Sequence, residues 1–427
     1  MLKFLYNLFL PLGFLFFIPG LLYKYRYRGG WKNTFAERFG KFLPERIEEL
    51  KAFKGAVWVH AVSVGETVVA LSLIKKWTLL HPEMKFVIST TTTTGQELAR
   101  KQCLENTAVI FCPIDFKWIV RKTLNLIAPS QLVIFETEIW PNLVWESKKR
   151  QIPVSIVNGR MSDHSSKGYR RFKVFFGPLL RCFDKIMVQT RADADRYLSV
   201  SPHAQVIVCG NLKFDQAPPE NIPDPGVENY FGPGKFSFLL AVSTHPGEER
   251  VVAESFIQLK KFFPDLRLVI VPRHAERGQE IGEMLSELKL SFVRRSLAEK
   301  AASPVDVLLA DTTGEMFKFI NIADLVIMGK SLAGHDEGHN LIEPALLDKP
   351  IVTGSTLRNF RFILNVLKDA DGVVTVDDDS HLTETLQKLL ADDSLRLGIG
   401  KRGGDAIRQH AGATETTIHH LSAFFSR

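Results

Sequence analysis

Short apolar runs alternate with helix-like segments along most of the chain, and this alternation constrains the fold more than any other feature of the sequence. Residues 56–59, 86–90 and 132–135 are runs of this kind, too short for a helix and rich in β-branched and aromatic residues. Strands that alternate with helices predict parallel sheets covered by helices on both faces. We therefore expect an α/β protein.

A stretch rich in proline and glycine divides the alternation into two halves of similar size. It runs from residue 216 to 235 and contains five prolines and three glycines. Such composition is typical of a linker, and a chain of 427 residues is long enough for two or three domains. We expect Rossmann-like domains over residues 30–215 and 236–427, facing a central cleft that binds the ligand. The last helix is expected to pack back on the first domain.

The N-terminal residues carry a different signal. Residues 4–23 contain no charge, and five cationic residues follow within 24–38. An apolar helix of about 20 residues spans a bilayer, and a basic flank marks its cytoplasmic side. We expect residues 1–29 to form a membrane anchor with a basic flank, and the rest of the chain to lie in the cytoplasm. Two prolines and two glycines leave open whether the segment spans the bilayer or lies in its interface.

Composition disfavours several classes of protein. The four cysteines are scattered without a C-x-x-C pair, so we expect no disulfide framework and no thiolate metal site. The net charge of +7 suits an anionic partner, but no zinc finger or RNA-binding motif supports a nucleic acid. No G-x-G-x-x-G follows directly on a predicted strand, and G-x-x-x-x-G-K-[ST] and G-x-S-x-G are missing. A nicotinamide dehydrogenase, a P-loop ATPase and an α/β-hydrolase are therefore disfavoured.

Polar side chains follow the predicted strands of the first half. Glu66 stands in the turn between the strand at 56–59 and a helix that continues from Val68. Ligands of open α/β sheets bind where strands hand over to helices, so Glu66 is placed to act as a general base. The alternative is that its carboxylate only interacts favourably with the helix dipole.

Two more carboxylates and a lysine occupy similar places. Glu136 and Glu138 follow the strand at 132–135 and, on an extended segment, point to opposite faces, so we expect only one to face the site. Either acid has the alternative role of capping a neighbouring helix. Lys213 follows the last strand of this half and suits a phosphate or carboxylate, unless it is a solvated partner of Asp215.

The second half offers groups for an anion. Ser243 and Thr244 precede a helix with acidic residues in its first turn, which predicts a capping box or a phosphate site on the same N–H groups. Arg273, after another strand, suits bidentate anion binding. A glycine-rich loop at 334–338 is expected to open a helix with Asn340 early and Glu343 one turn later, where Glu343 accepts from ribose hydroxyls.

A metal is not expected in this half. His335 and His339 have the i, i+4 spacing of zinc ligands on a helix. Gly334 and Gly338 favour a loop instead, and a loop does not bring such a pair together. We therefore expect neither a metal nor another cofactor.

Six motifs in both halves together resemble one family. They are residues 59–66, 136–142, 210–215, 243–245, 271–274 and 338–345. In this order they are similar to the motifs of the 3-deoxy-D-manno-oct-2-ulosonic acid (Kdo) transferases of lipopolysaccharide biosynthesis, over residues 1 to about 425. The chain departs from the usual pattern at Lys330, at Leu341 and in the loop at 333–338.

The resemblance implies a GT-B glycosyltransferase at the bacterial inner membrane. It implies an inverting, metal-independent transfer of one or more Kdo residues from CMP-Kdo to a lipid A precursor, lipid IV-A. Glu66 would be the base, and Glu136 and Lys213 would stabilise the transition state. The residues implied for CMP are Pro272, Arg273, Thr313, Gly314, Glu315, Asn340, Leu341, Ile342 and Glu343, with Ser243, Thr244, Gly329 and Ser331 beside them.

Two other functions are open on this sequence. One is a GT-B transferase or an epimerase that uses a UDP-sugar, although an epimerase needs no membrane anchor. The other is a non-enzymatic protein that binds anionic lipid. The presence of Glu66, Glu136, Lys213 and Arg273 together argues against the second.

Overall fold

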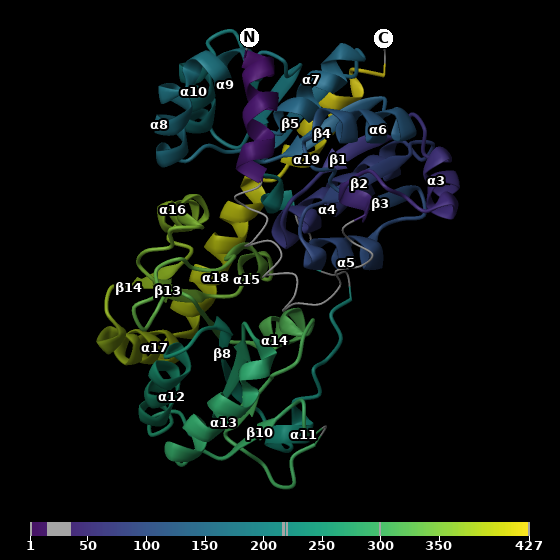
Figure 1. The fold of residues 1–427 in the computed structure, drawn as a ribbon. Helices are drawn as coiled ribbons and strands as arrows, with labels where there is room; N and C mark the ends of the chain where they lie inside the picture. The colour runs from purple at the N-terminus through teal and green to yellow at the C-terminus, as the bar shows by residue number, and fades with distance from the viewer. Residues whose placement is uncertain (1, 15–35, 216–217, 219–220, 299, 426–427) are drawn as a thin grey trace. The chain divides into compact units, whose positions relative to one another are not determined.

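The computed structural model of the chain contains two compact units (Figure 1). It describes all residues except 1, 15–35, 216–217, 219–220, 299 and 426–427. The first unit comprises Met1–Gln216 and Ala411–Arg427, and the second comprises Ala217–His410. The predicted α/β class with parallel sheets is confirmed in both units.

The described part of the first unit contains a seven-stranded parallel sheet in the order β3-β2-β1-β4-β5-β6-β7. The four central strands β2, β1, β4 and β5 are buried along their whole length, which explains why they read as continuous apolar runs. The strands are β1 (Val57–His60), β2 (Phe86–Thr90), β3 (Thr107–Phe111), β4 (Gln131–Phe135), β5 (Val154–Gly159), β6 (Lys185–Val188) and β7 (Val206–Val208).

Helices cover both faces of this sheet, and alternate residues of β1 serve the two cores. Trp58 packs into one hydrophobic cluster, while Val57 and Val59 pack into the other. Each cluster is therefore closed by its own layer of helices. The helices are α3 (Pro44–Lys51), α4 (Val64–Leu80), α5 (Thr93–Gln102), α6 (Lys117–Ile127), α7 (Pro141–Lys149), α8 (Asp163–Arg171), α9 (Lys173–Leu180), α10 (Arg191–Val200), η1 (Leu212–Asp215) and α19 (Ala413–Ser422).

The C-terminal helix α19 belongs to the first unit. The carboxylate of Asp215 accepts hydrogen bonds from the backbone N–H groups of Gly412 and Thr414, at the start of α19. Ile418 and Leu421 are buried in the cluster that contains α4. Residues at the end of the chain thus complete a core that begins with β1.

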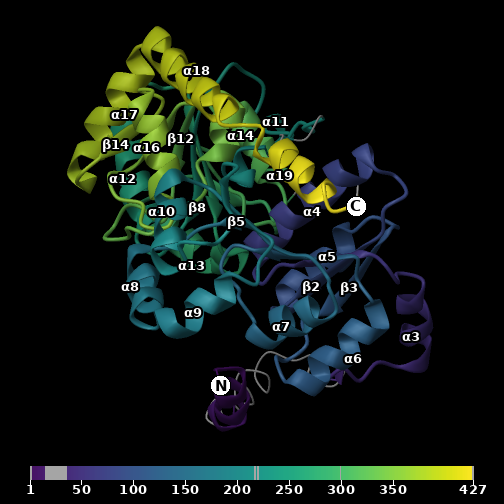
Figure 2. The ribbon, with the colours of Figure 1, turned by 90° about the horizontal axis from the view of Figure 1, so that it is seen from above.

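A helix over residues 2–14 packs on the first unit, next to α7 and α9 in two perpendicular views (Figures 1 and 2). The Tyr6 hydroxyl donates to Asp115 Oδ2 at 2.8 Å, and its ring contacts Trp145 of α7 and Phe175 of α9. No helix within the described ranges is long and apolar enough to cross a membrane. Residues 1 and 15–29, the rest of the expected anchor, lie outside the described residues, so the anchor stays a prediction.

The described part of the second unit repeats the architecture with a seven-stranded parallel sheet in the order β10-β11-β9-β8-β12-β13-β14. Its strands are β8 (Ser237–Thr244), β9 (Leu266–Pro272), β10 (Phe292–Arg294), β11 (Val307–Leu309), β12 (Leu325–Met328), β13 (Ile351–Gly354) and β14 (Val374–Val376). Its helices are α11 (Glu228–Phe231), α12 (Glu248–Leu259), η2 (Ala275–Arg277), α13 (Gly278–Glu287), α14 (Met316–Ile322), α15 (Ile342–Leu346), α16 (Arg361–Asp369), η3 (Asp379–His381), α17 (Leu382–Ala391) and α18 (Asp393–Gln409).

We predict that Asp215→Ala loosens α19 from the first unit. Two charge-assisted hydrogen bonds are lost, so we expect the free energy of unfolding to fall by about 2 kcal/mol. Amide hydrogen exchange should accelerate at residues 412–422 before other parts of the unit. Glu415→Ala is the control, because the Glu415–Lys76 pair is exposed and should contribute little. Equal effects of the two changes would contradict this role of Asp215.

Candidate functional site

Both sheets have a switch point where consecutive connections leave in opposite directions. It lies between β1 and β4 in the first unit and between β8 and β12 in the second. Ligands of open α/β sheets bind outside the carboxyl ends of the strands at such points. The loops that follow these four strands carry most of the predicted site residues.

Glu66 lies in the first turn of α4, directly after β1, in a reciprocal helix cap. The Ser63 hydroxyl accepts from the Glu66 N–H, and the Glu66 carboxylate accepts from the Val62 N–H at 2.9 Å and the Ser63 hydroxyl at 3.0 Å. Glu66 therefore lies at the helix N-terminus, as the alternative of an interaction with the helix dipole requires, and the cap fixes the orientation of its carboxylate. Burial raises the pKa of Glu66, and the negative charge of Glu136 raises it further against the opposing hydrogen bonds.

Glu136 follows β4, the strand next to β1, and is buried in a left-handed backbone conformation with φ of 53°. Its N–H still donates to Val157 O of β5, so the sheet register holds while the chain turns sharply. The Arg160 Nε donates to Glu136 Oε2 at 2.8 Å, and the Lys213 Nζ lies 3.9 Å from Oε1. Glu136 thus brings two cations of the first unit together.

Glu138 joins the same electrostatic cluster. Burial has the largest effect on the pKa of Glu138 and raises it, and the negative charges of Glu66 and Glu136 raise it further. The expectation that Glu136 and Glu138 point to opposite faces assumed an extended segment. That premise does not hold, because Glu136 is in a left-handed conformation.

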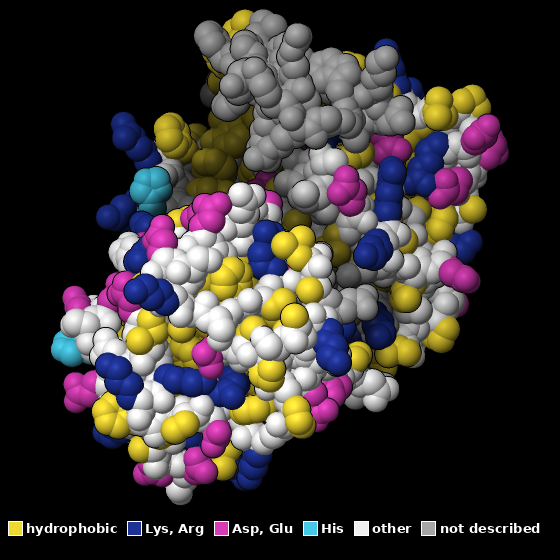
Figure 3. Space-filling model, turned by 90° about the horizontal axis from the view of Figure 1, so that it is seen from below, with side chains coloured by type: hydrophobic (Ala, Val, Ile, Leu, Met, Phe, Trp, Pro, Cys, Tyr) yellow, Lys and Arg dark blue, Asp and Glu magenta, His cyan; other side chains and the backbone are white. Residues whose placement is uncertain are grey.

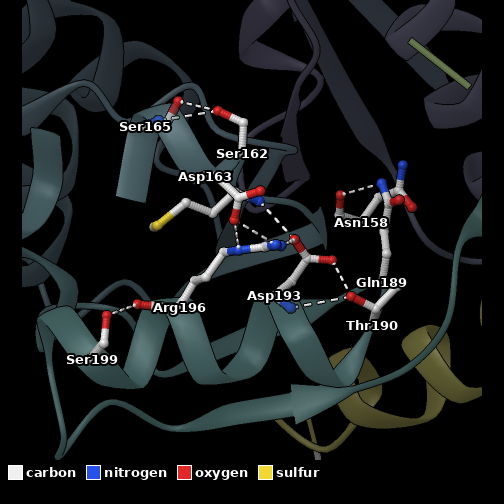
Figure 4. A network of polar contacts seen from close by, with 10 residues as sticks. Asn158, Ser162, Asp163, Ser165, Gln189, Thr190, Asp193, Arg196 and Ser199 are labelled. Atoms are coloured by element: carbon white, nitrogen blue, oxygen red, sulfur yellow. Dashed lines mark hydrogen bonds and ion pairs between the residues drawn. The ribbon is translucent and has the colours of Figure 1, made fainter. Parts of the chain in front are cut away.

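A polar network fixes the loop that carries Arg160 (Figure 4). The buried Asp193 of α10 accepts from the Met161 N–H at 2.9 Å and from the Thr190 hydroxyl at 2.5 Å. Arg196, one turn further along α10, lies 2.8 Å from Asp163 of α8. The backbone of Met161, the residue after Arg160, is therefore held by α10.

Lys213 is placed by the polar side chains around it. Asn158 Oδ1 accepts from the Leu212 N–H at 3.1 Å, and Asn211 Oδ1 accepts from the Lys213 N–H at 3.0 Å. The carboxylate of Asp215, the alternative partner of Lys213, accepts hydrogen bonds from the N–H groups of residues 412 and 414. The first unit thus gathers Glu66, Glu136, Glu138, Arg160 and Lys213.

In the second unit a single carboxylate organises the loops after β8 and β12. Glu248 is fully buried, and its oxygens accept from the backbone N–H groups of His245, Lys330, Ser331 and Leu332 at 2.7–2.8 Å. Ser243 and Thr244 are the last residues of β8 and do not cap α12, whose N-cap is Gly247. The alternative, that they bind a phosphate, stays a prediction.

Gly329 and Ser331 serve the backbone of this loop. A Cβ on Gly329 would lie 2.4 Å from the Ser243 carbonyl oxygen, so only glycine permits the close approach of the two loops. The Ser331 hydroxyl donates to Met328 O and accepts from the Gly354 N–H. These two residues shape the loop, and Lys330 between them is left-handed with φ of 62°.

Arg273, directly after Pro272 at the end of β9, lies among histidines. Its N–H donates to Thr244 O at 3.1 Å. His245 Nε2 lies 3.0 Å from His339 Nε2, so one ring donates to the other. Burial lowers the pKa of His339 to about 3, and the charge of Arg273 contributes. Burial lowers the pKa of His245 to about 4, and the positive charge of Lys330 contributes.

The residues at 340–343 lie differently from the expectation. Helix α15 begins at Ile342 and has only five residues, so Asn340 and Leu341 precede it. The reason is that Gly338 is left-handed and the Asn340 carboxamide accepts from the Ile342 N–H, which keeps the chain in a turn. Burial raises the pKa of Glu343, while Asn340 and then Arg273 lower it, so these three groups lie together.

In the segment at 313–315, Glu315 is bonded to neighbouring side chains, whereas Thr313 and Gly314 are exposed. The Glu315 carboxylate is engaged by Arg295 through two hydrogen bonds of 2.8 and 2.9 Å and by Thr312 and Lys318. The bonds from Arg295 lower the pKa of Glu315 to about 2. Thr313 and Gly314 are exposed, and Gly314 has φ of 84°. Their backbone, with the Thr313 hydroxyl, is what this segment can offer a ligand.

Sequence reasoning missed Arg160, Glu248 and the contact of His245 with His339. Arg160 had a signal, because it follows β5 directly, as Glu136 follows β4. Glu248 had only a local signal, since the N–H of His245 lies three positions before it. Its other partners, and the ring partner of His245, lie 82 to 94 positions away. Across the described residues no group of three His, Cys, Asp or Glu side chains could hold a metal ion.

Comparisons with known proteins define the class and then the family. A family model of 3-deoxy-D-manno-octulosonic-acid transferase matches residues 33–216. The Bordetella pertussis 3-deoxy-D-manno-octulosonic acid transferase is 30% identical over 404 residues, covering 92% of each chain. The Haemophilus influenzae enzyme of the same name is 28% identical over 93% of this chain and 92% of its own.

Solved structures agree on the fold. A UDP-N-acetylglucosamine 2-epimerase is 13% identical with a TM-score of 0.60, covering 88% of this chain and 97% of its own. Acinetobacter baumannii MurG is 13% identical with a TM-score of 0.53, covering 87% and 99%. The two parallel α/β units thus resemble the GT-B architecture. The chain belongs to the Kdo transferase family, whose members transfer Kdo in lipopolysaccharide biosynthesis.

We predict that Glu136→Gln lowers the pKa of Glu66. The change removes a negative charge that disfavours ionisation of Glu66, while the amide oxygen still accepts from Arg160. The transition of the Glu66 carboxyl carbon in an NMR titration should move to lower pH, and that of Glu138 should follow. Glu105→Gln, at an exposed site, should leave both transitions in place. An upward move after Glu136→Gln would contradict the cluster.

Proposed function

We propose that the chain transfers Kdo from CMP-Kdo to a lipid A precursor such as lipid IV-A, with inversion and without a metal ion, and that it works at the bacterial inner membrane. The observation that carries the proposal is the placement of Glu66. A capped, oriented carboxylate with a raised pKa lies at a strand-end switch point, and the charge that acts on it comes from Glu136, which pairs with two cations. That is the arrangement that a general base for a sugar transfer needs.

Glu66 is proposed as the base. Its carboxylate takes the proton of the acceptor hydroxyl while the hydroxyl oxygen bonds to the anomeric carbon of Kdo. The bond from that carbon to the CMP phosphate oxygen breaks in the same step, and CMP leaves with the electron pair. A single displacement inverts the anomeric centre. The raised pKa brings Glu66 closer to neutral pH, where a base is most effective.

Glu136 and Lys213 are proposed to stabilise the negative charge of the transition state. The donor is anionic, since CMP-Kdo carries a phosphate and a sugar carboxylate. Lys213 and Arg160 supply positive charge at the switch point, and the buried Glu136 holds them in place. Fixed cations that need no reorganisation stabilise charge that develops in a transition state. They take the part that a metal ion plays in other transferases.

The second unit is proposed to bind CMP. Arg273 suits the phosphate, because its guanidinium can donate two parallel hydrogen bonds. Glu343 is mostly buried and lies near Arg273 and Asn340, where its oxygens can accept from the ribose hydroxyls. The backbone at 313–314 and the loop from Gly329 to Ser331 complete the proposed nucleotide site.

The experiment that tests this function is a transfer assay with products read by mass spectrometry. Purified protein is incubated with detergent-dispersed lipid IV-A, CMP-Kdo generated in place and excess chelator. A mass gain of one or more Kdo units supports donor, acceptor and metal independence together. Transfer from a UDP-sugar without transfer from CMP-Kdo would overturn the donor, and recovery only on adding a divalent ion would overturn metal independence.

We predict that Glu66→Gln lowers the transfer rate at least about a hundredfold, the usual contribution of a general base. The amide oxygen still accepts from the Val62 N–H, so the cap and the fold should survive. Binding of CMP, measured by calorimetry, should be unchanged. Glu83→Gln, at an exposed site before β2, is the control. Unchanged turnover after Glu66→Gln would exclude Glu66 as the base.

We predict that Arg273→Ala weakens CMP binding by about tenfold to a hundredfold, as expected for a lost charge-assisted contact to phosphate. Cytidine, which has no phosphate, should bind both forms alike. Arg250→Ala is a matched control, since Arg250 lies on α12 and pairs with Glu254 and Glu287 at the surface. A loss of cytidine binding as large as that of CMP would place Arg273 away from the phosphate.

A further inference from the structure

Lys330, the second residue after β12, has a backbone conformation that is unusual for a lysine. Its φ is 62°, in the left-handed region that glycine enters freely and a residue with a Cβ enters at a cost. The Lys330 N–H donates to Glu248 at 2.7 Å, and the Lys330 carbonyl oxygen accepts from the Gly338 N–H at 2.7 Å. Stability alone would favour glycine at this position, so the lysine points to a function of the side chain.

Other strained residues lie in the same loops. Ser243, at the end of β8, has φ of 57°, and Ala333, three residues after Lys330, has φ of 51°. Two carboxylates maintain this backbone, since Glu248 accepts from the N–H groups around Lys330 and Asp379 accepts from the Ala333 N–H at 2.9 Å. Strain that the surrounding structure maintains is common at ligand sites.

The charge of Lys330 acts on the contact between His245 and His339. Burial lowers the pKa of both rings, and the positive charge of Lys330 lowers both further. With a pKa of about 4 for His245 and about 3 for His339, neither ring is charged at neutral pH. The positive charge beside this pair is therefore that of Lys330 and of Arg273, which also acts on His339.

The ammonium group of Lys330 is available to a ligand. Lys330 Nζ lies 3.9 Å from Glu337 Oε1, which makes an ion pair that is too long for a hydrogen bond. The side chain of Lys330 is 27% exposed, so it is neither buried in the core nor fully solvated. An ammonium group has three donors, and a ligand oxygen is able to accept from them at hydrogen-bond distance.

The order of the strands places a cation on each side of the histidine pair. Arg273 directly follows β9, His245 directly follows β8, and Lys330 follows β12. In the sheet β8 lies between β9 and β12. Neighbouring strands are about 4.8 Å apart, so the backbones of Arg273 and Lys330 are about 10 Å apart across His245. Two long cationic side chains at this separation are able to reach two neighbouring anionic groups of one ligand.

The balance of charge at these loops differs from that of another surface of the protein. On the face shown in Figure 3, Lys and Arg side chains are interspersed with Asp and Glu over its described part. Such a mixture is typical of a solvated surface. After β12, the carboxylate of Glu248 is occupied by backbone N–H groups, and Glu337 balances Lys330 only at 3.9 Å. An anionic ligand would complete the charge balance there.

We propose that Lys330 binds the carboxylate of the transferred sugar, while Arg273 binds the phosphate of the same donor. The inference rests on the proposed function, in which the donor is CMP-Kdo, and adds a residue that recognises the sugar. In CMP-Kdo the carboxylate and the phosphate are attached to the same carbon, so two neighbouring cations fit them. Arg273 has the phosphate because it lies near Glu343, the proposed ribose ligand. Lys330 lies across the histidine pair, where the sugar follows.

The assignment makes Lys330 a residue that determines specificity for the donor. A sugar without a carboxylate, as in many UDP-sugars, gives the ammonium group no anion to bind. The ammonium group would then lose hydration without gaining a charged partner, which disfavours such a donor. Lys330 thus selects the sugar, whereas Arg273 binds a phosphate that every nucleotide donor carries.

The experiment measures binding of CMP and of freshly prepared CMP-Kdo to the full chain, by displacement of a fluorescent CMP derivative. No acceptor is present, so no transfer takes place. Lys330→Gly should bind CMP-Kdo about tenfold more weakly, as expected for one lost charge-assisted contact, and should bind CMP within about twofold of the unaltered chain. Lys330→Arg, which keeps the positive charge, should lose less than about threefold for CMP-Kdo.

Lys289→Gly is the matched control. Lys289 is also a left-handed lysine, with φ of 57°, and it is exposed between α13 and β10, at the opposite edge of the sheet. The change removes the same charge and relieves the same backbone strain, so binding of both ligands should be unaltered. Neither glycine variant should lower the melting temperature. A lower melting temperature of Lys330→Gly with weaker binding of both ligands would make Lys330 a structural residue and overturn the proposal.

The other outcomes separate this inference from the proposed function. Equal binding of CMP-Kdo by Lys330→Gly and the unaltered chain would overturn the role of Lys330 and leave the proposed function standing. An equal loss for CMP and CMP-Kdo would assign Lys330 to the phosphate instead of the sugar carboxylate. If the unaltered chain binds CMP but not CMP-Kdo, the donor is wrong, and the proposed function fails together with this inference.

Discussion

Buried carboxylates that accept backbone N–H groups hold the loops of this protein in place. Loops at the ends of parallel strands leave N–H groups without sheet partners, and a buried N–H without an acceptor is costly. Glu248 collects four such groups in the second unit. In the first unit Asp115 accepts two and Asp193 one, and the half-buried Asp215 accepts two. The geometry of both candidate sites depends on these bonds.

Burial also changes the titration of several acids. It raises the pKa of Asp115, which holds backbone N–H groups, to about 6. It also raises the pKa of Glu66, Glu138 and Glu343. Groups whose pKa is raised by burial and by like charge are common at reactive sites, so the electrostatics agree with the family.

The sequence predicted the fold well because strands buried on both faces read as unbroken apolar runs, and these runs are visible without knowing their order in the sheet. It also predicted that Glu66 lies where β1 leads into a helix, since a local cap has a local pattern. It was wrong on the extended backbone at 136–138, because nothing in the residues around Glu136 signals a left-handed backbone at a non-glycine position. The pairing of His245 with His339 was out of reach, since it depends on how β8 and β12 become neighbours.

The return of the last helix to the first unit has a consequence for synthesis. Residues 411–422 bury Ala413, Ile418 and Leu421 in a core that otherwise consists of residues before 216. A ribosome releases those early residues long before it makes α19, so the first unit waits with part of an apolar surface open while the second is made. The second unit, drawn from one continuous stretch, is able to finish folding first.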